Sequence, residues 1–537
     1  MKNTWSKTLT TGIAAGALSL LAVSAVHALP ASACTAVYVG QDASEDGTTI
    51  VARSNDYPDV WPNYLTVVDR VENQPGRTMP VDNNNTVQAE IPATTYKYTA
   101  TPWMDSATTY NKLESDAAAC ANEYGVSMTM SISAFANDAA LEADPLVENG
   151  LTEFTADDLV ICQSKTAREA VDTLLGLVDK YGSSECNIAL ISDQTETWYV
   201  EMYTGHQYAA VKLPADQVAV FGNEYNLEYV SDYEDSILSE DLEKTAVKNG
   251  FAAYGENKEL NLMKTYAIDP INYSHMRTWI GHQVLAPSVY GADYEQDAVY
   301  PLTFQADSKV SLKDVMELMR NRFDGTSYSP DETGRKDMRV IGTDTALSVH
   351  IFQTYPDLPA DMSCVTWESA SPTLYGVFVP VSNMSTRVSE AYALNQPASD
   401  LGLFDTETYP WYTFRDLNTL CVSDKKTYGD SVRAYWSKAE DSMITGMDKV
   451  LRTAAASDKS EAKKAEYITS YCVSMQDNAF KDAKAILNQV RWTMSKNCNT
   501  MKVGRNPETH DTTDEEKLPD PIVLTIEGSD YTNVPKF

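Results

Sequence analysis

The sequence predicts an α+β fold, in which strands and helices occupy separate stretches of the chain. Residues 34–133 and 187–223 are dominated by β-branched and aromatic runs separated by turn residues, which is typical of strands. Strand patterns return between residues 346 and 379, whereas residues 432–497 are rich in Ala, Lys and Glu, which are good helix formers. Strands early, helices between, strands late and helices last indicate an α+β architecture.

The first 33 residues have the composition of an export leader. Two lysines form a basic end, and residues 9–26 are apolar or small without a charge. Thr and Ser interrupt this run, so it fits a signal peptide better than a membrane anchor. Small residues typical of cleavage sites end at Ala28 and again at Ala33. We therefore expect residues 1–33 to be removed as a signal peptide, with or without a short propeptide, and the protein to be secreted or held at the cell surface.

Cys34 directly follows this leader, and three interpretations fit its position. As the first residue of a mature chain, it would combine a nucleophilic thiol with an α-amine whose reference pKa is about 7.7–8.0. As an acylated cysteine, it would anchor a solute-binding lipoprotein, although that class prefers a larger aliphatic residue where Ala31 stands. In the third interpretation it is an ordinary small core residue.

The residues after the cysteine favour the first interpretation. Residues 35–39 predict a strand, an Asp-Gly pair predicts a hairpin turn, and residues 48–52 predict a second strand that returns toward the start. A lipoprotein usually continues with a flexible polar linker, whereas this chain enters a strand at once. The hairpin brings Arg53 and Asp56 close to the thiol.

The motifs around this hairpin are specific as a set. They are Cys34-Thr35, Val39-Gly40, Ala43-Ser44, Asp46-Gly47, and Ala52-Arg53 followed by Asp56. In these motifs the chain resembles the dipeptidase A family of cysteine peptidases, which belongs with penicillin V acylase and conjugated bile acid hydrolase among the N-terminal-nucleophile hydrolases. Four later stretches also resemble the family, so the resemblance runs to about residue 500: 122–126, 193–201, 321–326 and 363–380.

The resemblance implies a four-layer αββα sandwich, with two antiparallel sheets face to face and helices outside. We expect a hydrolase domain at 34–425, C-terminal helices packed on it at 426–500, and a polar tail at 501–537 in which residues 521–526 form an edge strand. Helical spacing inside the domain predicts four further helices, at 156–181, 234–247, 274–285 and 308–321.

The resemblance also implies a mechanism. Cys34 Sγ would attack a peptide carbonyl, and its own amino group would take the thiol proton and later deliver it to the leaving amine. Arg53 would favour the thiolate, and Asp56 would accept a hydrogen bond from the α-ammonium. The plain alternatives are a surface arginine at a strand end and a turn-forming aspartate.

The resemblance to the related acylases also implies roles for two later residues. Asn223, in a Phe-Gly-Asn-Glu stretch after a predicted strand, would lend its side-chain amide to the oxyanion. Arg277, which lies 54 residues later, would support the surroundings of the cysteine. A turn-capping asparagine and a helix-surface arginine are the alternatives. The stretch from Ser131 to Ser133 is expected to supply a backbone N–H to the oxyanion.

Composition limits the partners. The formal net charge of −34 argues against nucleic acid and anionic lipid surfaces as partners. The family resemblance implies dipeptides or short peptides as substrates. No pair among the six histidines has a metal-ligand context, and we predict no metal and no cofactor. Seven cysteines remain besides Cys34, and sequence leaves open whether they form disulfides or stay as buried thiols.

Two other functions remain open at this stage. An amidase that cuts non-peptide amides, of the penicillin or bile-salt type, would use the same catalytic machinery and differ only in its pocket. The other is the solute-binding lipoprotein with an acylated Cys34, which would have no catalytic role.

Overall fold

Two antiparallel sheets form the centre of the molecule. The computed structural model describes residues 34–57, 61–104, 117–130, 132–335, 338–395, 404–500, 508 and 520–537, so the predicted leader lies outside the described residues. One sheet has the strand order β14 (Val218–Phe221), β1 (Ala36–Val39), β2 (Thr49–Asp56), β16 (Ala346–Thr354), β17 (Cys364–Ala370) and β18 (Val379–Ser382). The other has the order β15 (Ser236–Leu238), β13 (Tyr208–Lys212), β12 (Thr197–Met202), β11 (Asn187–Ser192), β10 (Ser127–Thr129), β9 (Ala117–Asn122), β8 (Tyr98–Pro102) and β3 (Thr66–Val68).

Short hairpins and helices complete the fold. Two small ribbons pair β4 (Val71–Glu72) with β7 (Thr94–Thr95) and β5 (Thr78–Pro80) with β6 (Gln88–Glu90). The helices are α1 (Asp138–Ala143), α2 (Glu153–Ile161), α3 (Ala167–Tyr181), α4 (Leu242–Asn249), α5 (Leu262–Tyr266), α6 (Asn272–Leu285), α7 (Leu312–Leu318), α8 (Pro330–Thr333), α9 (Pro410–Ser423), α10 (Asp430–Ala455) and α11 (Glu461–Thr500). Two 3-10 turns, η1 (Val230–Asp232) and η2 (Ala360–Met362), and a π-helical segment, η4 (Lys425–Gly429), also occur in the described part of the chain.

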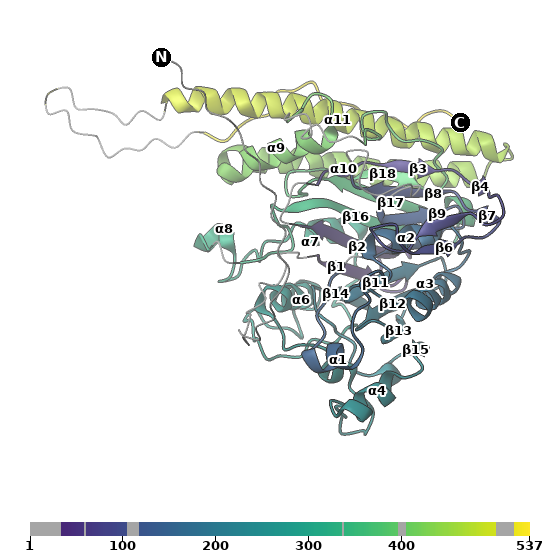
Figure 1. Cartoon of the computed structure of the whole chain (residues 1–537). Helices are drawn as coiled ribbons and strands as arrows, with labels where there is room; N and C mark the ends of the chain where they lie inside the picture. The colour runs from purple at the N-terminus through teal and green to yellow at the C-terminus, as the bar shows by residue number, and fades with distance from the viewer. Residues whose placement is uncertain are drawn as a thin grey trace, which may run out of the picture. The chain divides into compact units, whose positions relative to one another are not determined.

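The two sheets and the helices outside them form four layers (Figure 1). The buried apolar side chains fall into three clusters that correspond to the interfaces between these layers. Successive residues of β2 show why, because side chains of a strand alternate between its two faces. Val51 belongs to the cluster between the sheets, whereas Ile50 and Ala52 belong to the cluster under α6, α7 and α9–α11. The third cluster joins the other sheet to α2 and α3. The expected αββα arrangement is thus present.

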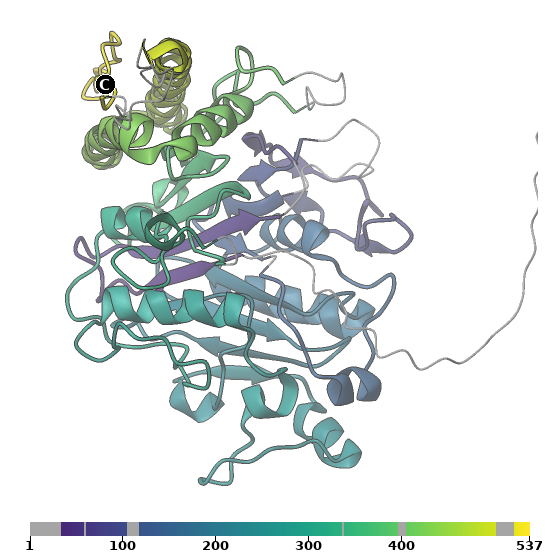
Figure 2. The same cartoon turned by 90° about the vertical axis from the view of Figure 1, so that its left-hand side faces the viewer.

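The C-terminal helices lie together over one end of the first sheet (Figure 2). Helices α10 and α11 both contact β18, and α9 packs against α11 and β17. The paired helical patterns expected between 432 and 497 are confirmed, with the break at residues 456–460. Because α11 buries Ile468, Met475 and Leu487 in the same cluster as the sheet, these helices are part of the core.

Three predicted elements differ from the observed ones. The helix expected over 156–181 is two helices, because Thr166 accepts a hydrogen bond from Glu169 N and starts α3 anew. The helix expected over 234–247 begins only at Leu242, since residues 236–238 pair with β13 instead. The last strand, whose pattern was expected to end by residue 379, lies later, at Val379–Ser382, where it pairs with β17.

The edge strand expected at residues 521–526 is also wrong, since this extended segment pairs with no strand of the described chain. Side chains of two helices hold it instead. Gln489 of α11 donates to Val523 O and accepts from Thr525 N, and Ser431 of α10 donates to Ile522 O. The alternating apolar residues therefore reflect docking on helices.

Seven cysteines are described, and none of them is in a disulfide. Six of the seven are buried, including Cys34, and Cys186 is half-buried. The side chain of Cys498 lies outside the described residues. The same part of the chain contains no helix that is both long and apolar enough to cross a membrane.

Candidate active site

Cys34 lies at the start of β1 and faces the space between the two sheets. It is 1% exposed and belongs to the apolar cluster there. The backbone at Thr35 is fastened to β2, because Thr35 N donates to Ser54 Oγ and Ser54 N donates to Thr35 O, both at 2.9 Å. The expected hairpin of β1 and β2 therefore fixes the position of the cysteine.

Arg53 contacts the thiol of Cys34. Ala36 and Arg53 are direct partners in the β1–β2 register, and Arg53 points to the same face as Cys34. Its Nη2 lies 3.5 Å from Cys34 Sγ and 3.1 Å from Asn55 Oδ1, to which it donates. Arg53 is fully buried, so it is not the surface arginine of the alternative interpretation.

Asn223 follows β14, the strand on the other side of β1. The register pairs Ala36 with Phe221, so continuing it by two residues brings Cys34 level with Asn223. Asn223 Nδ2 donates to Ser133 O at 2.7 Å, which places the expected oxyanion stretch beside it. Ser131, the first residue of that stretch, lies outside the described residues.

Arg277 of α6 joins these two strands from the helix side of the sheet. Its Nη1 donates to Cys34 O at 2.5 Å and to Thr35 Oγ1 at 2.9 Å, and its Nη2 donates to Asn223 Oδ1 at 2.9 Å. Burial lowers the pKa of this guanidinium to about 10, against the opposing effect of Asp56. The side chain therefore stays charged near neutral pH and holds Cys34 and Asn223 in one network.

Gly222 allows the arginine to reach this position. A Cβ atom at residue 222 would lie 2.8 Å from Ser274 O and 3.1 Å from Arg277 Cζ. Any side chain here would push α6 away from β14, because contacts below about 3.0 Å force a shift. Gly222 thus allows α6 to pack closely against the end of β14.

Asp56 ends β2 and faces the helix side rather than the space between the sheets. Its Oδ2 accepts from Arg339 Nη2 at 3.0 Å, and its Oδ1 accepts from Thr345 Oγ1. Burial raises the pKa of this carboxyl above its ordinary value, although Arg339 acts in the opposite direction. Cys34 follows Ala33 in the printed chain, so its nitrogen is a peptide nitrogen, and no recorded hydrogen bond joins it to Asp56 among the described residues. The role expected for Asp56 stays a prediction.

Sequence reasoning missed the groups that support these residues. Thr35 and Ser274 contact Arg277, and Arg339 and Thr345 contact Asp56. Glu201 was also missed: its carboxylate accepts from the backbone N–H groups of residues 226 and 227, just after Asn223. Burial raises the pKa of Glu201 to about 7. The one sequence feature that could have indicated Glu201 is its place at the end of the family-like stretch 193–201.

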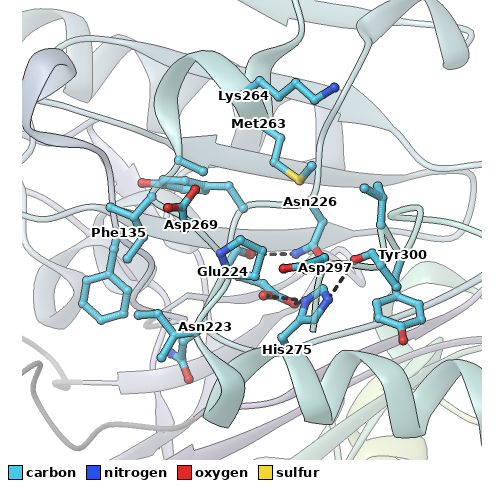
Figure 3. Close-up of a pocket in the computed structure, with 17 residues that line it drawn as sticks. Phe135, Asn223, Glu224, Asn226, Met263, Lys264, Asp269, His275, Asp297 and Tyr300 are labelled. Atoms are coloured by element: carbon cyan, nitrogen blue, oxygen red, sulfur yellow. Dashed lines mark hydrogen bonds and ion pairs between the residues drawn. The ribbon is translucent and has the colours of Figure 1, made fainter. Parts of the chain in front are cut away.

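A cavity of about 320 Å³ opens beside Asn223 (Figure 3). Glu224 in the cavity wall already has two partners. His275 Nδ1 lies 3.1 Å from its carboxylate, and the Thr278 hydroxyl donates to it. Burial opposes protonation of His275, but the hydrogen bond and charge of Glu224 raise its pKa above the ordinary value. Asp269 and Asp297 line the same cavity and are exposed.

No group of three or more potential metal-ligating side chains occurs among the described residues.

Comparison with known proteins identifies relatives over most of the chain. The model of Peptidase family C69 matches residues 33–438. A probable dipeptidase B of Streptococcus pyogenes serotype M1 is 30% identical over 492 residues, which cover 88% of this chain and 95% of the relative. Dipeptidase A of Lactobacillus helveticus is 26% identical over 374 residues, covering 67% of this chain and 77% of the relative. The family expected from the motifs around Cys34 is confirmed.

Among solved structures, conjugated bile acid hydrolase from Clostridium perfringens aligns with a TM-score of 0.34 and 10% identity, covering 65% of this chain and 92% of that protein.

Proposed function

The chain belongs to peptidase family C69, a family of cysteine-type dipeptidases, and we propose that it hydrolyses dipeptides and other short peptides with Cys34 as the nucleophile. The observation that carries this proposal is the buried position of Cys34 Sγ at the start of β1, 3.5 Å from Arg53 Nη2. The names of the relatives supply the substrate class.

The proposed reaction begins when residues 1–33 have been removed. The α-amine of Cys34 takes the thiol proton, and the thiolate attacks the carbonyl carbon of the peptide bond. The nearby guanidinium of Arg53 stabilises negative charge on the sulfur. Asn223 Nδ2 turns from Ser133 O to the oxyanion of the tetrahedral intermediate, and a donor of this kind contributes about 2.7–4 kcal/mol.

Acylation and then hydrolysis complete the reaction. The C–N bond breaks, and the leaving amine takes the proton from the α-ammonium, which leaves a thioester on Cys34. Water then gives a proton to the α-amine and attacks the thioester carbonyl, and the departing sulfur recovers that proton. Arg277 keeps Cys34 and Asn223 in place throughout, because it donates to both.

We also propose that the chain is exported and that Cys34 becomes its first residue. The leader composition supports this, and the family match begins only at residue 33, where the proposed leader ends. Removal after Ala28 followed by self-cleavage, and removal directly after Ala33, both lead to the same mature start.

A substrate panel tests the function. Processed enzyme should turn over dipeptides with varied side chains faster than tripeptides, and it should not cleave penicillin V or a glycine-conjugated bile salt. Turnover of the conjugated amides alone would identify an acylase instead. A diacylglycerol on Cys34, detected by intact mass of native protein, would identify the lipoprotein. Failure to cleave any dipeptide would remove the proposal.

A further inference from the structure

Asp157 in α2 is a buried carboxyl that the proposed mechanism does not use. It is fully buried, and neither carboxylate oxygen has a hydrogen-bond partner among the described residues. The backbone N–H of Met130 is near enough to favour the ionised form but does not reach hydrogen-bonding geometry. The next residue, Asp158, accepts a 2.6 Å hydrogen bond from Tyr98. Buried polar groups without partners are rare and costly, so this carboxyl requires an explanation.

Asp157 lies near the arginine that contacts Cys34. Helix α2 packs against β10, Thr129 Oγ1 of β10 lies 2.9 Å from His350 Nε2, and His350 is the register partner of Arg53 in β2. Burial raises the pKa of its carboxyl well above the usual range, and among the charges that act on it Arg53 has the largest effect and lowers it. Arg53 is the residue that contacts Cys34 Sγ, and it also donates to Asn55 Oδ1. Asn55 Nδ2 is a second buried atom with no partner in the described part of the chain. Two side chains with unused hydrogen-bonding capacity therefore flank the arginine next to the nucleophile.

A row of aromatic rings begins on the same face of α2. Phe154 lies one turn before Asp157, so the two side chains are neighbours on the helix. The ring centroids of Phe154 and Trp103 are 4.4 Å apart, those of Trp103 and Trp61 5.1 Å, and those of Trp61 and Tyr57 4.7 Å. These rings are half-buried, and aromatic faces attract cations.

The chemistry of a dipeptide fits this arrangement. Its protonated amino group is only two bonds from the carbonyl carbon that Cys34 Sγ must attack, so its binding partner has to lie beside the cysteine. An ammonium group needs acceptors, and Asp157 offers two unused oxygens. We propose that Asp157 binds the free amino terminus of the dipeptide, with the aromatic row against the first side chain. This inference rests on the proposed dipeptidase function.

The cavity beside Asn223 is the rival location for the amino terminus. Asp269 and Asp297 line it, and they have no recorded ion pair or hydrogen bond among the described residues. Both are exposed, however, so water already solvates them and they gain less from a ligand cation than a buried carboxyl does. The experiment therefore includes both sites.

The test compares free and N-acetylated dipeptides of the same sequence on processed, full-length enzyme. Asp157→Asn should reduce the ratio of kcat/KM for the free dipeptide to that for the acetylated one by about tenfold to hundredfold, mainly through KM. The melting temperature should not fall, because asparagine has the same shape and removes a buried carboxyl. The double variant Asp269→Asn/Asp297→Asn should leave the ratio within about twofold of the unmodified enzyme.

Three outcomes would overturn the inference, and each is recognisable. An unchanged ratio in Asp157→Asn with intact folding would exclude Asp157 as the amino-terminal partner. A fall of the ratio in the double variant alone would move the amino terminus to the cavity. If the unmodified enzyme cleaves no dipeptide, the proposed function fails and this inference fails with it.

Discussion

Cys34→Ala is expected to lose at least about 10⁴-fold in kcat for dipeptides, because no other group can form the thioester. The thiol lies 3.5 Å from Arg53 Nη2, which stabilises its ionised form. Cys34→Ser should retain slow turnover, since a hydroxyl is a poorer nucleophile at neutral pH. Initial rates of dipeptide hydrolysis by purified variants measure both effects.

A matched cysteine provides the control. Cys472 is also buried and free, but it lies in α11 against Met447, far along the chain from the site. Cys472→Ala should keep its rate within about twofold. If a propeptide follows the signal peptide, Cys34→Ala should also leave it attached, which intact mass would show. Near-normal turnover by Cys34→Ala would disprove the assignment of the nucleophile.

Arg277→Met is expected to lower kcat by about 10²-fold or more. The arginine donates to Cys34 O, Thr35 Oγ1 and Asn223 Oδ1, so its loss releases both the nucleophile and the oxyanion donor. It should also lower stability, because each buried acceptor left without a donor costs about 1–3 kcal/mol. Rates and thermal unfolding should be measured on the same preparation.

The controls separate charge from geometry. Arg277→Lys keeps a positive charge but not the planar set of donors, so it should recover little of the rate. Arg452→Met removes two exposed ion pairs, one with Asp357 and one with Asp448, and should leave the rate unchanged. If Arg277→Met unfolds at a lower temperature but turns over normally below it, the arginine is only structural.

The sequence was most informative where the site is local. Cys34, Arg53 and the strand turn between them lie within one hairpin, so motif spacing alone brought them together. Asn223 and Arg277 could be predicted only through family resemblance, because the register of β14 with β1 and the packing of α6 are not visible in a single sequence.

The parts that could not be predicted depend on distant contacts. Asp56 is held by Arg339 and Thr345, which lie almost 300 residues later, so no local pattern indicated them. The unused oxygens of Asp157 are likewise a property of the folded chain. Residues 521–526 have the alternating apolar residues of a strand, but side chains of two helices, Gln489 and Ser431, hydrogen-bond to their backbone. The alternation therefore indicated a one-sided buried segment, but not that helices would cover it.

The central claim is that the amino group of Cys34 itself serves as the base. The direct measurement compares dipeptide turnover by two purified forms, one beginning at Cys34 and one carrying a single uncleaved methionine before it, with each start confirmed by intact mass. We predict that the first form is active and the second is not, although both fold. Equal activity of the two forms would contradict the account.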